Sequence, residues 1–213
     1  MKQVPYEGNR GGSSCALSCY TMAARYLWPD KGITFEQLAE IADYHAGYVA
    51  WGFAVWKWMV EQGARIVNYD VVDYAAWARG GLKGFEKSIS PESFEYYNKV
   101  TFDIGKDTKD LQALFGQPGF DFVQKQVTWD DVVREFHKPG ICDVSINLRV
   151  IDDEDGFVGH RVVLLDITDD EVVFHDPRSK PGYAKRHEPL VKFKRAFDDI
   201  PDGAELCRYS LAA

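Results

Sequence analysis

The hydrophobic pattern of this chain changes its period between its two halves. From Cys15 to Gln62 the apolar residues recur at helical spacing in three segments. From Ile141 to Leu211 they alternate or form short apolar runs, as in strands. Helices therefore come first and strands come last, which favours an α+β fold in which an N-terminal helical lobe packs on a C-terminal antiparallel sheet lobe.

Capping residues indicate where the N-terminal helices begin and end. Ser13 and Ser14 are good N-cap residues for the first helix, and Thr34 opens a capping box with Gln37 for the second. Gly63 is a usual C-cap for the third. The predicted elements are helices at 15–27, 34–43 and 51–62 and a strand at 64–72.

The C-terminal half contains a predicted hairpin that turns at Asp169 and Asp170. The apolar run 162–165 suits a central strand, and Pro177 stops the strand after the turn. The predicted strands are 120–126, 141–151, 159–167, 171–176 and 204–211, with helices at 128–137 and near 193–197. The less regular stretch 73–126 is rich in aromatic residues and is expected to carry short helices.

The sequence is expected to form one domain over residues 1–213, because it contains no repeat, low-complexity tract or Pro- or Gly-rich linker. We divide it into a first lobe at about 1–70, a variable aromatic-rich insert at about 71–127, and a sheet lobe at about 128–213. A chain of this length buries about 70% of its unfolded surface, so it needs neither disulfides nor a metal to hold a core.

The charge balance excludes several classes of protein. The 25 Lys and Arg residues against 33 Asp and Glu residues give a net charge of −8, which argues against binding nucleic acid or an anionic membrane surface. No apolar run reaches about 18 residues, so we expect no membrane-spanning helix. The polar start of the chain predicts no secretory signal. We therefore expect a cytoplasmic protein with four free thiols.

One of these thiols, Cys15, lies at the predicted start of a buried helix. The N–H groups and the dipole of the first turn favour a negative charge there, which lowers the pKa of a thiol. The thiolate is the nucleophilic form, and backbone N–H groups at the same point can stabilise an oxyanion. Cys15 is therefore the candidate nucleophile.

A thiolate nucleophile needs a base and a group that orients the base. His160 follows Gly159 at the start of a central strand, where a side chain can face a cleft, and Asp176 ends the neighbouring strand of the hairpin. A turn at 169–170 places both at the same end of the sheet. Asp176 shares its strand face with Val172 and Phe174, whereas the rival base His175 lies on the opposite face.

Ordinary structural roles compete with these assignments. Cys19, Cys142 and Cys207 are best explained as core residues. A metal site from Cys15 and Cys19 with a histidine lacks a second ligand pair, so we predict no metal. The remaining aromatics are best explained as core, although Trp51 and Gly159 are candidates to line a substrate cleft.

The ordered set resembles a known family. Cys15 with its helix, Gly159-His160 before an apolar strand, and Asp176-Pro177 after a hairpin are similar to the bacteriocin-leader-processing peptidases, family thirty-nine of the papain-like cysteine peptidases. The resemblance covers about residues 4–69 and 128–211. The family has a Gln where this chain has Asn9, and Cys-Gly-Pro where it has Cys15-Ala16-Leu17.

The resemblance implies a papain-like fold and a thiol-dependent amide hydrolase without cofactor or metal, acting on a peptide or protein. Cys15 would be the nucleophile, His160 the base, Asp176 its orienter and Asn9 an oxyanion donor. The acidic loop 152–155 before His160 favours a cationic or neutral substrate segment. Two alternatives stay open: an acyltransferase or deamidase with the same triad, and a non-catalytic module that binds a peptide or partner.

Overall fold

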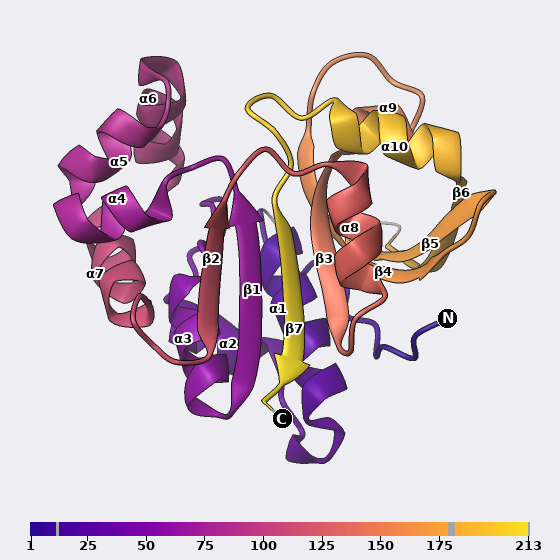
Figure 1. Ribbon diagram of the computed structural model, residues 1–213, viewed down its shortest axis with the longest axis horizontal. Helices are drawn as coiled ribbons and strands as arrows, with labels where there is room; N and C mark the ends of the chain where they lie inside the picture. The colour runs from indigo at the N-terminus through magenta and orange to yellow at the C-terminus, as the bar shows by residue number, and fades with distance from the viewer. Residues whose placement is uncertain (12, 179–181, 213) are drawn as a thin grey trace.

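The computed structural model describes residues 1–11, 13–178 and 182–212, and within these ranges the fold is α+β. The described strands form one sheet in the order β2-β1-β7-β3-β4-β5-β6 (Figure 1). Their bounds are β1 Ala64–Asp70, β2 Phe120–Gln124, β3 Ile141–Asn147, β4 Gly159–Ile167, β5 Glu171–Asp176, β6 Tyr183–Pro189 and β7 Leu206–Leu211. None of the helices in the described part of the chain is both long and apolar enough to cross a membrane.

The α-helices occupy both halves of the sequence. Their bounds are α1 Cys15–Leu27, α2 Phe35–Ala42, α3 Phe53–Glu61, α4 Tyr74–Gly80, α5 Leu82–Ser88, α6 Pro91–Val100, α7 Ile104–Leu114, α8 Trp129–Phe136, α9 Leu148–Ile151 and α10 Leu190–Asp198. A short 3-10 helix, Pro29–Lys31, follows α1.

The sheet is mixed, which corrects the predicted antiparallel lobe. β1 and β2 pair in parallel, and β1 also pairs antiparallel with β7, so strands from the first lobe and from the insert extend the C-terminal strands. A parallel pair needs a long crossover connection, and helices α4–α7 supply it here. The remaining pairs in the described sheet are antiparallel.

Helices cover both faces of the sheet. Helices α1–α3 lie behind it and α8 and α10 in front of it in the view of Figure 1. Along β4, Val163 and Leu165 join the core on the α1 side, whereas Val162 and Leu164 join the core on the α10 side. A strand buried on both faces explains the uninterrupted apolar run, and β4 confirms the predicted central strand.

Local signals predicted several boundaries correctly. The helix predicted at 15–27 is α1, and Thr34 and Thr128 both form capping boxes at the starts of α2 and α8. The strand predicted at 141–151 is too long: it ends at Asn147, whose side-chain oxygen accepts the backbone N–H of Arg149 and starts the short helix α9.

Strand β6 lies in a segment after Asp176 for which the sequence predicted neither helix nor strand. Most of its side chains are exposed or partly exposed, so it shows no hydrophobic alternation. It is the edge strand of the sheet and pairs with β5. The helix predicted near 193–197 is longer than expected, because α10 begins at Leu190.

Candidate active site

Cys15 is the first residue of α1, and its side chain is half-buried. The helix packs against β4, so the start of α1 meets the strand that carries His160. Ser14 occupies the N-cap position, but its hydroxyl does not cap the helix: it donates to the side-chain oxygen of Asn9. The backbone N–H groups of Arg161 and Ala16 favour negative charge on the sulfur of Cys15.

His160 and Asp176 form a buried hydrogen-bonded pair. Nε2 of His160 lies 2.8 Å from Oδ1 of Asp176. The two strands pair with Val163 opposite His175, and a bulge between Leu164 and Asp166 shifts the register by one residue. The hairpin thus brings the two residues together at one end of the sheet.

The three side chains form a connected series. His160 uses Nε2 for Asp176, and its side chain also interacts with the thiol of Cys15, whose pKa it lowers. The second ring nitrogen, Nδ1, is the one left for the sulfur. The three predicted catalytic residues therefore meet, although they come from α1, β4 and β5.

The electrostatics favour a thiolate beside an imidazolium. Burial opposes ionisation of Cys15, but His160 and the backbone N–H groups of Arg161 and Ala16 together outweigh it, so the pKa of Cys15 lies below its ordinary value. Burial alone lowers the pKa of His160, yet its hydrogen bonds to Asp176 and Cys15 raise that pKa to about 9. Burial likewise disfavours the charge on Asp176, but His160 and Arg178 hold the pKa of its carboxyl below its usual range.

Asn9 lies next to the start of α1. Its side-chain oxygen accepts the backbone N–H of Gly11 at 2.8 Å and the hydroxyl of Ser14. These contacts hold the carboxamide oxygen in place. The predicted oxyanion donor is therefore held close to the residue that precedes Cys15.

The two predicted cleft residues lie in different surroundings. Gly159 is exposed at the start of β4 and precedes His160 directly. Trp51 is half-buried in an aromatic cluster, where its ring packs against Phe53 and Trp77. Its Nε1 donates to the hydroxyl of Thr101 at 3.0 Å. Trp51 thus joins the insert helices to the first lobe.

The rival groups have structural partners. Nε2 of His175 lies 2.9 Å from the carbonyl oxygen of Val4, and its Nδ1 accepts the backbone N–H of Lys185 at 3.2 Å. Both ring nitrogens are therefore used, and burial lowers the pKa of His175. Cys19, Cys142 and Cys207 are fully buried, as predicted, and burial raises the pKa of each. All four cysteines are in the described part of the chain and carry free thiols.

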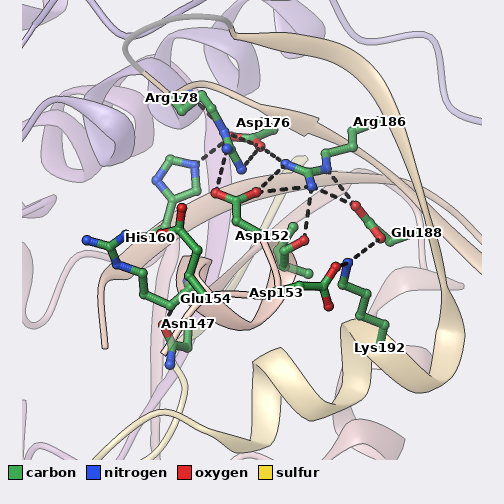
Figure 2. A network of polar contacts seen from close by, with 12 residues as sticks. Asn147, Asp152, Asp153, Glu154, His160, Asp176, Arg178, Arg186, Glu188 and Lys192 are labelled. Carbon is green, nitrogen blue, oxygen red and sulfur yellow. Dashed lines mark hydrogen bonds and ion pairs between the residues drawn. The ribbon is translucent and has the colours of Figure 1, made fainter. Parts of the chain in front are cut away.

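Sequence reasoning missed a set of charged residues around Asp176. Arg178 and Arg186 both contact its carboxylate, and both also contact Asp152 (Figure 2). Asp152 was expected to belong to a solvated acidic loop, but it is an ion-pair partner inside this network. The nearby acids Asp153 and Glu154 pair with Lys192 and Arg149, so the loop's negative charge is largely compensated. The expected preference for a cationic or neutral substrate segment, which was based on this loop, stays a prediction with weaker electrostatic support.

Within the described ranges, no group of three or more His, Cys, Asp or Glu side chains has an arrangement that could hold a metal ion. Comparison of the sequence with protein families finds no matching family, and comparison with curated proteins finds no significant match. The chemistry of the site therefore has to be inferred from its own residues.

Proposed function

We propose that this protein is a papain-like cysteine peptidase, or a closely related thiol-dependent amide hydrolase, that acts on a peptide or protein. One observation carries the proposal: Cys15 at a helix start interacts with His160 strongly enough to lower the pKa of its thiol, and Nε2 of His160 binds the buried carboxylate of Asp176. Nucleophile, base and orienter in this series are what acyl transfer through a thiolate requires.

The proposed reaction begins with attack of the Cys15 thiolate on a carbonyl carbon of the substrate. A C–S bond forms, and the carbonyl electron pair moves onto oxygen. The resulting oxyanion is stabilised by the backbone N–H of Cys15 and by the carboxamide NH2 of Asn9. Asn has the amide donor of the family's Gln on a shorter side chain, and the contacts that hold its carboxamide oxygen support this role.

His160 then acts as a general acid. The imidazolium gives a proton to the leaving amine as the C–N bond breaks, which leaves a thioester on Cys15 and a neutral imidazole. The imidazole takes a proton from water, the hydroxide adds to the thioester, and the carboxylic acid leaves as the thiolate and imidazolium are restored. Asp176 holds the ring and stabilises the imidazolium in both half-reactions.

Labelling with a library of thiol-reactive peptide probes, followed by mapping of the modified residue, tests this proposal. We expect modification at Cys15, loss of labelling in Cys15→Ala, and unchanged labelling in the matched control Cys19→Ala, whose thiol is buried on the same helix. Absence of peptide-dependent labelling at Cys15 would contradict the proposal and favour a non-catalytic binding module.

The products distinguish the reactions that one triad supports. A peptidase cleaves a peptide of the sequence selected by the labelling library and releases a new amino terminus. A deamidase releases ammonia, and an acyltransferase joins the acyl group to an added amine. Each product should disappear in Cys15→Ala. Formation of only ammonia or only the amine adduct would replace hydrolysis of a peptide bond by the corresponding alternative.

A further inference from the structure

Two arginines bind the carboxylate that orients His160. Asp176 is fully buried, and its Oδ1 faces His160. Its other oxygen, Oδ2, lies 2.8 Å from Nε and 2.7 Å from Nη2 of Arg178, and 3.0 Å from Nη1 of Arg186. The backbone N–H of Arg178 also donates to Oδ1 at 3.2 Å. The carboxylate therefore has few ways to rotate, and it offers one oxygen to the imidazole.

The arginines are themselves held by acids. Nη1 of Arg178 lies 2.7 Å from Oδ2 of Asp152, and Nη2 of Arg186 lies 3.2 Å from Oδ1 of the same residue (Figure 2). Arg186 also donates to the carbonyl oxygen of Ile151 and pairs with Glu188 at 2.7 Å. The side chains of both arginines are only 15% exposed. Planar guanidinium groups with this many partners have fixed positions.

The charges around His160 come from several elements. Asp176 on β5 and Asp152 at the end of α9 carry two negative charges, and Arg178 and Arg186 carry two positive charges. Arg161, the next residue on β4, directs its charge to Asp143 and Glu205 instead. Among the described residues, further titratable groups near the pair are Cys15 and Cys19 on α1 and Tyr6, whose hydroxyl donates to the carbonyl oxygen of Asp176.

We propose that Arg178 and Arg186 are positioning residues of the triad, which hold Asp176 toward His160 and keep positive charge behind its carboxylate. This inference rests on the proposed function. An orienting carboxylate without countercharge would bind the imidazolium proton more tightly and make His160 a poorer acid for the leaving amine. The two guanidinium groups oppose this effect while the carboxylate still selects the ring orientation.

The proposal predicts that neutralising either arginine shifts the titrations of Cys15 and His160 in the same direction. Loss of one positive charge near Cys15 and His160 favours the protonated form of each group. The pH at which the Cys15 thiolate forms and the pH at which the His160 imidazolium loses its proton should therefore both rise, by on the order of 0.5–1 pH unit. A purely structural role would lower the amount of folded protein without moving both midpoints together.

Both midpoints can be measured without a substrate. The rate of Cys15 alkylation by iodoacetamide as a function of pH reports the thiolate, and an NMR titration of the His160 ring reports the imidazolium. Arg186→Gln and Arg178→Gln should raise both midpoints. Arg186→Lys keeps the positive charge, so both of its midpoints should stay close to those of the unaltered protein. If Arg178→Gln does not fold, the two Arg186 variants decide the outcome.

Lys192→Gln is the matched control. Lys192 belongs to the outer part of the same network, where it binds Asp153 at 2.7 Å and lies 3.6 Å from Glu188. Removing its charge should leave both midpoints unchanged. The proposal is overturned if the Arg186→Gln midpoints match those of Lys192→Gln. If they shift as expected but peptide probes find no turnover, the positioning role stands and the proposed peptidase activity fails.

Discussion

Replacing His160 by alanine tests whether the imidazole is what ionises Cys15. In the intact site His160, together with the backbone N–H groups of Arg161 and Ala16, outweighs the burial of the thiol, which by itself raises the pKa. His160→Ala removes the contributions of His160, which are the largest of those that lower the pKa, so we expect the pKa of Cys15 to rise. Because only the thiolate reacts, alkylation of Cys15 should slow at neutral and acidic pH.

The size of the effect follows from the ordinary pKa of a cysteine thiol, 9.0. A thiol with that pKa is about 1% ionised at pH 7 and about 0.01% ionised at pH 5. Full ionisation would increase the thiolate population about 100-fold at pH 7 and about 10,000-fold at pH 5. The nucleophilicity of a thiolate, however, falls as its pKa falls, with a Brønsted coefficient of about 0.45. Compared with an ordinary thiol, the net advantage of an ionised Cys15 is therefore at most about tenfold at pH 7 and about hundredfold at pH 5.

The assay measures iodoacetamide modification of the peptide that contains Cys15 from about pH 5 to about pH 10 by mass spectrometry. Removing the imidazole also exposes the sulfur. Each alkylation rate is therefore divided by the rate of the same protein at the highest pH, where Cys15 is largely ionised in both the unaltered protein and His160→Ala. The normalised difference should grow as the pH falls. Equal normalised rates at about pH 5 would show that His160 does not ionise Cys15.

Two further predictions concern the buried charges of the sheet. Arg161→Met leaves the carboxylate of Asp143 buried beside Glu205 without its cation, and should lower the free energy of unfolding by about 3–5 kcal/mol in urea denaturation; a loss below about 1 kcal/mol would contradict this. Burial and the charge of Glu205 raise the pKa of Asp70 to about 7. A carboxyl whose pKa is raised on folding stabilises the protein at low pH, and this stabilisation is lost as the pH rises from the unfolded pKa to the folded pKa. Asp70→Asn should therefore gain stability relative to the unaltered protein by at most about 1.4 kcal/mol per pH unit between about pH 4 and about pH 7. Parallel curves of unfolding free energy against pH would refute this prediction.

Those parts of the fold that depend on neighbouring residues could be predicted from the sequence. The capping boxes at Thr34 and Thr128 are hydrogen-bonded within one turn, so four residues suffice to identify each start. The parallel pairing of β1 and β2 could not be predicted, because it depends on how the insert helices return the chain to the sheet. β6 was missed because an exposed edge strand has no apolar face to produce alternation.

The same limit applies to the candidate site. Cys15, His160 and Asp176 could be selected because a helix start, a strand start and a hairpin end each leave a local pattern. The contacts of Arg186 with Asp176 depend on the pairing of β6 with β5, which the sequence did not reveal. An arginine in an unassigned segment has no visible partner, so the network around the carboxylate appears only in the structure.

The segment before α1 explains how a site divided between a helix and a sheet keeps its geometry. Val4 accepts the hydrogen bond from His175 on β5, and two residues later the hydroxyl of Tyr6 donates to the carbonyl oxygen of Asp176. Glu7 then pairs with Arg25 on α1 at 2.9 Å. The chain is thus attached to the strand that carries the orienting carboxylate and to the helix that carries the nucleophile. Residues that take no part in the proposed chemistry therefore hold the helix start and the strand end together, so the fold itself contributes to the placement of Cys15 beside His160.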